Sequence, residues 1–157
     1  MSSTSTIPVA YRELQRVLSA VDWPARLGQS DAAVDVEIAS ELRDEGREIV
    51  LIGQVRGDQE FTALGAKHRD EDYTISLFVV VRYPGDSGLA ALERAWQLWA
   101  VVESLLSSAD YIALGQSQGV LWNELVNPIG TPTHEPEGSG YVVTSGVRFR
   151  SRIRPRS

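Results

Sequence analysis

A first amphipathic helix is predicted near the start of the chain, from about Pro8 to Val21. Proline is tolerated in a first helical turn. The apolar positions of this segment recur at helical spacing on one face, and they are Tyr11, Leu14, Leu18 and Val21. Asp22-Trp23-Pro24 should end the helix, because the residue before a proline avoids helical backbone angles.

A second helix is predicted to run to about Leu106, with Asp86 or Ser87 as the cap of its first turn. The buried stripe expected from the helical period comprises Leu89, Leu92, Trp96, Trp99 and Leu106. Core packing is the favoured interpretation of Trp96 and Trp99, and stacking on a ligand is the alternative.

Alternating apolar and polar residues predict strands between these helices. In residues 34–38 the apolar side chains point one way and the acidic ones point the other, in the order Val34, Asp35, Val36, Glu37, Ile38. Residues 49–55 predict a second, more buried strand. Turn residues at 43–46 favour pairing of these two strands as a hairpin. The clearest strand is 73–81, which is rich in β-branched and aromatic residues.

Polar composition predicts a long loop or an extended arm at residues 58–72. Two further strands are predicted, near 120–125 and from 141 to about 153. The proline- and glycine-containing stretch 127–140 between them is expected to be a loop.

The expected element order is therefore α-β-β-β-α-β-β. Strands clustered between helices favour an α+β fold, with a mainly antiparallel sheet and two helices packed on one face. We expect a single domain, in which residues 8–153 are the core, 1–7 are an N-terminal arm and 154–157 are a basic C-terminal tail.

Composition agrees with one globular domain, because 157 residues contain 43% hydrophobic and 23% charged residues. No apolar run approaches the roughly 20 residues that cross a bilayer. The first six residues lack the basic flank and the apolar run of a signal peptide, so export by the usual route is not expected. The chain has no cysteine, which excludes disulfides, thiolate metal sites and thiol nucleophiles.

Candidate catalytic and metal-binding residues are few. His68 and His134 have no metal-ligand spacing and are expected to be exposed in loops. Asp70-Glu71-Asp72 lacks the residue order of a calcium loop and is interpreted as a solvated acidic turn. No nucleophile, P-loop or dinucleotide motif occurs, so we expect neither an enzyme nor a cofactor or metal site.

The last strand carries the most informative pattern. Its odd positions are mostly apolar and share one face, whereas the even positions from 148 onward are Arg148, Arg150, Arg152, Arg154 and Arg156. Residues 1–140 have a net charge of −11 and residues 141–157 one of +5. A solvated face is one interpretation of this row; the favoured one is that it contacts carboxylates or phosphates of a partner.

Several stretches of the sequence, taken in chain order, resemble the tail terminator proteins of long-tailed, siphovirus-type phages, especially those infecting actinobacteria. They are residues 62–75, 78–81, Gly85-Asp86, 90–95, 100–103 and 146–149. The likeness extends from about Pro8 to Arg152 and rests on element order and loose motifs.

This resemblance implies a structural virion protein, assembled in the host bacterial cytoplasm and located in the neck of the tail. Such α+β subunits form a ring, usually a hexamer, at the head-proximal end of the tail tube. The ring stops tube growth and provides the surface that joins the head. The implied partners are other copies of the chain, the tail tube protein and a head-closure protein, with no membrane and no cofactor.

In such a ring, Asp35, Glu37 or Glu41 of one copy could meet the arginine row of the next, a head-to-tail contact that closes a ring. The alternative is that the row faces the channel and contacts DNA phosphates without reading sequence. The resemblance does not fix which of these the arginines do.

Two other functions stay open. One is another neck protein or a tail tube subunit, in which residues 59–72 would be the loop that pairs with the next ring. The other is a small enzyme or ligand-binding domain that uses Trp23 or Trp122 in a pocket.

Removal of divalent metal ions is predicted to leave the stability unchanged, because no metal-ligand spacing exists in the sequence. Thermal melts with and without a strong chelator should coincide. A midpoint lowered by more than a few degrees would instead assign a metal to residues 70–72.

Overall fold

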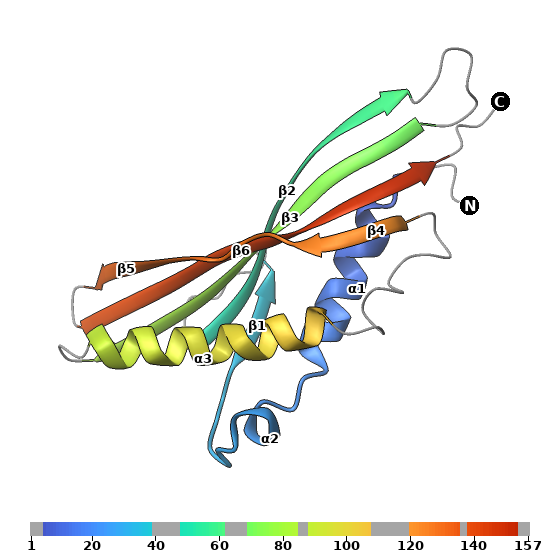
Figure 1. The fold of residues 1–157 in the computed structure, drawn as a ribbon. Helices are drawn as coiled ribbons and strands as arrows, with labels where there is room; N and C mark the ends of the chain where they lie inside the picture. Colours follow the sequence, from blue (N-terminus) through green and yellow to red (C-terminus); the bar gives the residue numbers. More distant parts are fainter. Residues whose placement is uncertain are drawn as a thin grey trace.

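A six-stranded, mostly antiparallel sheet forms the centre of this α+β structure (Figure 1). The computed structural model describes residues 5–38, 48–61, 69–84, 88–107, 120–135 and 138–153. Its helices and strands are α1 (Ile7–Ser19), α2 (Trp23–Leu27), β1 (Asp35–Ile38), β2 (Glu48–Phe61), β3 (Arg69–Pro84), α3 (Gly88–Leu106), β4 (Val120–Leu125), β5 (Ile129–Glu135) and β6 (Gly138–Ile153).

The strand order is β1-β2-β3-β6-β4, and β5 also pairs with β6. The 16-residue strands β3 and β6 are antiparallel along their whole length, from Pro84 beside Gly138 to Arg69 beside Ile153. On its other side, β6 pairs with β5 along its first half and with β4 along its second half. The sheet is thus built around β3 and β6.

The expected hairpin of residues 34–38 with β2 is wrong, because β1 pairs with β2 in parallel. Turn residues at 43–46 indicate that the chain bends, but they do not determine whether the next strand runs parallel or antiparallel to the first. Residues 39–47 lie outside the described ranges. The parallel register still places Val36 and Ile38 beside Val50 and Ile52, so the predicted inward face of this strand is confirmed.

The stretch 58–72, predicted to be a long loop or an extended arm, is strand over its described residues, 58–61 and 69–72. Asp58–Phe61 continue β2 and pair with Arg69–Asp72, which begin β3. The polar composition of this stretch gave no sign of the strands. Strand pairing uses backbone hydrogen bonds, and a polar side chain is compatible with it when that side chain faces water, packs, or has an ion partner. Residues 62–68 lie outside the described ranges.

The predicted loop at 127–140 contains β5, which pairs with residues 138–144 of β6. Proline and glycine gave this stretch the composition of a loop. Proline is tolerated in an edge strand, where the missing N–H faces away from the sheet, and Pro132 lies in this outer strand. Gly130 leaves room for the ring of Tyr141, which lies close to its backbone.

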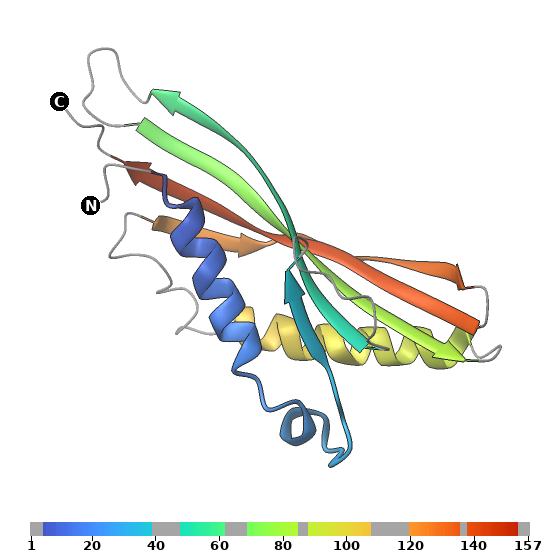
Figure 2. The ribbon, with the colours of Figure 1, turned by 180° about the vertical axis from the view of Figure 1, so that it is seen from behind.

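Both long helices lie on the same face of the sheet. Thr6, directly before α1, hydrogen-bonds to Tyr73 and Ser151, and Trp96 of α3 donates to the Tyr141 hydroxyl at 3.3 Å. All three sheet residues have odd numbers and point to one face of β3 and β6. Seen from behind, α1 lies toward the end of β6 and α3 toward its beginning (Figure 2). The prediction of two helices on one face is therefore confirmed.

The core is formed between these helices and the inward face of the sheet. Its largest sheet residues include Tyr73, Phe149, Ile52, Ile75 and Leu77, all at most 1% exposed. The α1 stripe is confirmed, with Leu14 and Leu18 buried and Tyr11 and Val21 packed beside them. None of the described helices is both long and apolar enough to cross a membrane.

The α3 stripe is rotated relative to the prediction. Leu89 is 68% exposed, Leu92 and Trp96 are half-buried, and only Trp99 and Leu106 of the predicted set are buried. The buried residues of α3 are Ala91, Arg94, Ala95, Leu98, Trp99, Val102 and Leu106. Two of these residues are alanines, whose small side chains occupy little space between the helix and the sheet. The prediction weighted the large side chains and passed over these small ones.

A short additional helix, α2, follows α1. The side chain of Asp22 accepts a hydrogen bond from the Ala25 N–H at 3.3 Å, and Gly28 ends the helix with a φ of 66°. Asp22-Trp23-Pro24 therefore starts a helix, whereas α1 has already ended at Ser19. Trp23 is buried in the core, which argues against its use in a ligand pocket; the side chain of Trp122 lies outside the described part.

Truncation of Trp99 is expected to destabilise the fold strongly. Its side chain is 3% exposed and its indole N–H donates to Glu103 at 3.2 Å. Trp99→Ala should lower the free energy of unfolding by about 3–5 kcal/mol in urea denaturation. Leu89→Ala on the same helix is the control, with an expected change below about 0.5 kcal/mol. Equal losses in both variants would contradict the observed orientation of α3.

Candidate functional site

The face of the sheet opposite the helices carries a row of arginine–aspartate ion pairs, called here the arginine ladder. It comprises Arg148, Arg150 and Arg152 of β6 with Asp70 and Asp72 of β3. Asp70 lies directly opposite Arg152, and Asp72 opposite Arg150. Even-numbered positions of both strands share this face, so the register alone brings the two charge runs together.

The pairs have good geometry. Arg148 makes two hydrogen bonds to the Asp72 carboxylate, from Nε at 2.9 Å and from Nη2 at 2.6 Å. The Asp70 carboxylate accepts from Arg152 Nε at 3.0 Å and from Arg150 Nη2 at 3.3 Å. Glu124 of β4 adds a longer contact to Arg148, at 3.6 Å. The ladder thus joins β3, β6 and β4.

Asp70-Glu71-Asp72 is therefore not the solvated acidic turn that was expected. The Asp70 side chain is only 7% exposed, whereas the three arginines are 38–44% exposed. The hydrogen bond from Arg152 lowers the pKa of Asp70, although burial opposes this, and that from Arg148 likewise lowers the pKa of Asp72. Both aspartates thus remain ionised below their usual pH range.

Glu71 lies between these aspartates but points to the helix-covered face, where it is 1% exposed. Its Oε1 accepts from the Thr6 N–H at 2.9 Å and from the Thr6 hydroxyl at 3.4 Å. The Thr6 side chain makes no cap hydrogen bond within its own helix. At the start of α1 the Thr6 N–H and hydroxyl are instead hydrogen-bonded by a carboxylate from β3. Burial raises the pKa of the neighbouring Tyr73, which stacks on Phe149 at 5.3 Å.

The acidic partners predicted for the arginine row lie elsewhere in the chain. Asp35 and Glu37 are in β1, which is separated from β6 by β2 and β3. Glu41, Arg154 and Arg156 lie outside the described residues. Contact of the row with a neighbouring copy stays a prediction, but Arg148, Arg150 and Arg152 each have an aspartate partner in their own chain. Charge reversal of these arginines would therefore also break intrachain pairs.

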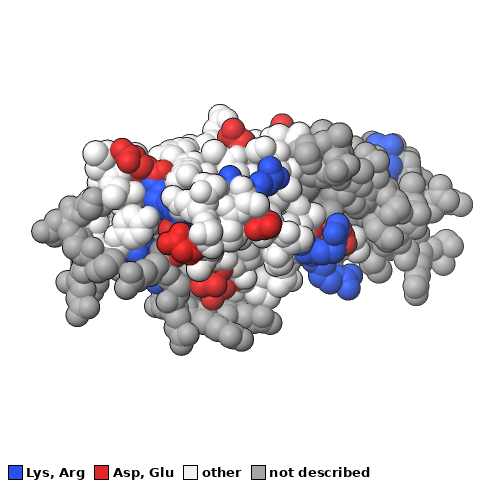
Figure 3. Space-filling model, turned by 90° about the horizontal axis from the view of Figure 1, so that it is seen from below, with Lys and Arg blue, Asp and Glu red and all other residues white. Residues whose placement is uncertain are grey.

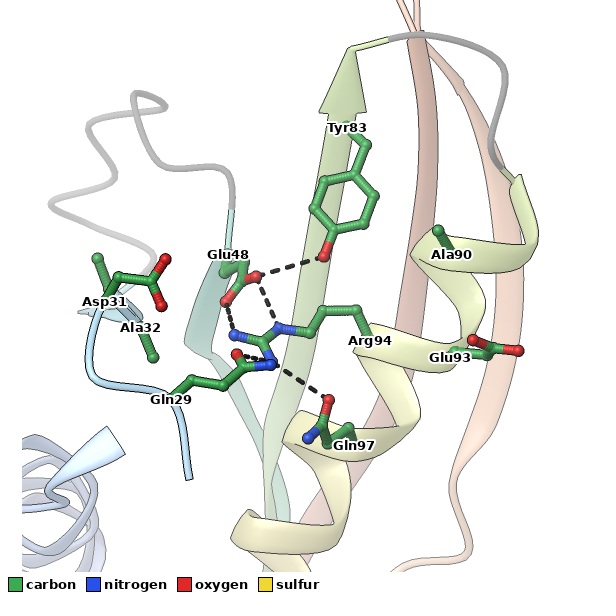
Figure 4. Close-up of a pocket in the computed structure, with 10 residues that line it drawn as sticks. Gln29, Asp31, Ala32, Glu48, Tyr83, Ala90, Glu93, Arg94 and Gln97 are labelled. Carbon is green, nitrogen blue, oxygen red and sulfur yellow. Dashed lines mark hydrogen bonds and ion pairs between the residues drawn. The ribbon is translucent and has the colours of Figure 1, made fainter. Parts of the chain in front are cut away.

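A second candidate site is a pocket of about 490 Å³, called here the acidic pocket (Figure 4). Its lining comes from four parts of the chain: Gln29 and residues 31–33 after α2, Glu48 at the start of β2, Tyr83 near the end of β3, and α3 from Ala90 to Gln97. Its size is within the range of ligand-binding pockets.

Arg94 forms the floor of the acidic pocket, with its side chain only 10% exposed. Its Nε and Nη2 donate to the two oxygens of Glu48 at 2.7 and 3.0 Å, and its Nη1 donates to Gln29 and Gln97 at 2.8 and 3.2 Å. This hydrogen bonding to Glu48 raises the pKa of Arg94. The guanidinium is therefore held by its own chain and ties α3 to β2 and to the segment after α2.

The Glu48–Arg94 pair could not be found from the sequence, because 46 residues separate its members. One signal was present: Arg94 falls at helical spacing between Ala91 and Leu98 on the buried face of α3. An arginine on a buried helical face requires a carboxylate or hydrogen-bond acceptors nearby. That requirement predicts that Arg94 has an acceptor partner, but it does not identify the partner as Glu48.

Two exposed carboxylates remain in the acidic pocket. In Figure 4, Asp31 and Glu93 lie on opposite sides of the Glu48–Arg94 pair. Since Arg94 and Glu48 balance each other, Asp31 and Glu93 give the pocket a net charge of −2. A pocket of this kind suits a cationic group.

Acidic and basic side chains are interspersed over the described part of the surface seen from below (Figure 3). Neither sign covers a large continuous area there, which is unlike the basic footprint of a nucleic-acid-binding face. Among the described residues, no three metal-ligating side chains are grouped closely enough to hold an ion. His68 and the side chain of His134 lie outside the described part.

Comparisons with known proteins add no identification, because no protein-family model and no curated protein sequence matches the chain.

The arginine ladder is predicted to make stability depend on pH in the acid range. Because the folded pKa of Asp70 is lowered, its stabilisation is present above the unfolded pKa of about 3.9 and is lost as pH falls through the folded value. Asp70→Asn should cost about 1–2 kcal/mol at pH 7, after discounting for the exposed arginines.

That cost should shrink as the pH is lowered below about 4, since the wild-type carboxylate is then also neutralised. Urea denaturation at pH 7 and pH 3 measures it. Asp35→Asn, at an exposed site of β1, is the control and should behave as wild type at both pH values. A cost for Asp70→Asn that is equal at the two pH values would contradict the ionic role.

Proposed function

We propose that this chain is a tail terminator subunit of a long-tailed phage, forming a ring that closes the head-proximal end of the tail tube. The ring, a hexamer in this proposal, stops tube growth and offers the surface that the head joins. The protein is then a structural component of the virion and not an enzyme.

The observation that carries this proposal is how the stretches of family resemblance are arranged. Of these stretches, 69–75 and 78–81 lie in β3, 90–95 and 100–103 in α3, and 146–149 in β6, while 62–68 and 85–86 lie outside the described residues. These three elements pack on one another, with β3 and β6 paired and α3 on their helix-covered face. A likeness of loose motifs has more weight when its parts form one structural unit than when they are scattered.

The uncovered face of the sheet also supports an assembly role. Leu51, Phe78, Val80 and Val142 are half-buried there, opposite the face that α1 and α3 cover. Gly53 lets the Phe78 ring lie close over β2, since a Cβ at this glycine would be 2.7 Å from the ring. A second copy in a ring is the partner we assign to this face, continuous with the arginine ladder on β6.

The tube-subunit alternative loses its main support. It relied on residues 59–72 as a loop free to pair with the next ring, but Arg69–Asp72 are paired with β6 in their own sheet. A head-closure protein remains the second candidate, because it would share the ring form and the location in the neck.

Electron microscopy of intact tails provides the test. One ring of the labelled chain is expected at the head-proximal end, and deletion of its gene should give tubes longer than those of the wild type. Copies along the whole tube would identify a tube subunit. Tubes of normal length that fail to join heads would identify a head-closure protein.

A further inference from the structure

The acidic pocket and the arginine-rich end of β6 lie at opposite ends of the molecule. Tyr83 lines the pocket and pairs with Ser139 at the beginning of β6, whereas Arg152 lies 13 residues further along this strand. At a rise of about 3.3 Å per residue, Arg152 is roughly 40 Å from the pocket. Figure 1 shows that β6 begins near the start of α3 and runs away from it.

We propose that the acidic pocket binds the segment Arg154-Pro155-Arg156 of a second copy of the chain. This inference rests on the proposed ring and names the contact between its neighbouring subunits. It differs from the contact with Asp35, Glu37 and Glu41 considered from the sequence.

Charge complementarity is the first support. Asp31 and Glu93 leave the pocket with a net charge of −2, and Arg154 and Arg156 bring +2. Asp31 and Glu93 stand on opposite sides of the pocket floor, so that each can meet one guanidinium (Figure 4). Paired guanidinium and carboxylate groups form strong, directional hydrogen bonds.

The second support is that the first three arginines of the row already have carboxylate partners in their own chain. The Asp70 and Asp72 carboxylates are engaged by Arg148, Arg150 and Arg152 within the chain. Pro155 restricts the residue before it to extended backbone, which suits a segment inserted into a neighbour.

The third support is reach, which excludes the pocket of the same chain. Arg156 is four residues beyond Arg152, and four extended residues span at most about 14 Å. This is far less than the roughly 40 Å to the pocket estimated from the strand rise. The contact is therefore head-to-tail between copies, the type that closes a ring when the rotation is suitable.

A mixing experiment with charge-reversed variants tests the inference. Asp31→Lys with Glu93→Lys makes the pocket basic, and Arg154→Glu with Arg156→Glu makes the segment acidic. In each double variant alone, the segment and the pocket carry like charges, so the association expected of the wild type in sedimentation velocity should be lost. An equimolar mixture should recover it, since alternating copies make every contact complementary.

Asp31 and Glu93 are exposed, and Arg154 and Arg156 lie outside the described residues, so circular dichroism and thermal melts of both variants are compared with wild type and should match it. Both variants associating like wild type would overturn the inference, and so would a mixture that fails to recover association.

Disulfide trapping tests the same contact when the purified protein associates too weakly for sedimentation velocity to detect. The chain has no cysteine, so Ala33→Cys in the pocket with Ser157→Cys introduces the only thiols. Oxidation should give a ladder of linked copies on a non-reducing gel. The matched control is Ala100→Cys with Ser157→Cys, at an exposed position two turns beyond Glu93; it should link far less.

The two proposals fail differently. A single ring at the tube end, together with no trapping in the pocket, would overturn this contact and leave the terminator function standing. Trapping in the pocket with copies along the whole tube would support the contact and reject the terminator function. A segment that traps equally at both positions would overturn its specificity for the pocket.

Discussion

The antiparallel pairing of β3 with β6 is the constraint on which the rest of the structure depends. Sixteen residues on each strand pair without a shift, so the parity of every side chain is fixed along the sheet. Odd positions form the floor for α1 and α3, and even positions form the arginine ladder. The same pairing places the acidic pocket near the beginning of β6 and Arg152 near its end.

Charged groups are used in two different ways around this sheet. Glu71 and the Glu48–Arg94 pair are buried at the helix-covered side, where each ties a helix to a strand. Removing one partner of such a buried pair leaves a charge without compensation, which costs far more than the pair contributes. The exposed ladder contributes less to stability, but it forms only in the observed register, because a slip of one residue would turn the arginines to the other face.

These features also change what the arginine row offers to a partner. Three of its arginines pair with two aspartates of their own chain, so the row presents less positive charge than its sequence indicates. The polarity of the molecule, with an acidic pocket and a basic segment far apart, suits head-to-tail assembly. Such assembly agrees with the proposed ring, in which each copy would insert its basic segment into one neighbour and bind the segment of the other neighbour in its pocket.

The sequence by itself determined the elements whose signals are local. Helical spacing located α1 and α3, and alternation located β1, β6 and their inward faces, because these patterns reflect burial on one side of a single element. Only the tertiary structure decided the parallel pairing of β1, the strand β5 and the continuation of β2 and β3 through residues 58–61 and 69–72. It alone joined Asp70 to Arg152 and Glu48 to Arg94, since partners 46 to 82 residues apart meet only when strand register and helix packing are set. The acidic pocket follows from the same cause: four separate segments line it, and no local pattern records which of them become neighbours.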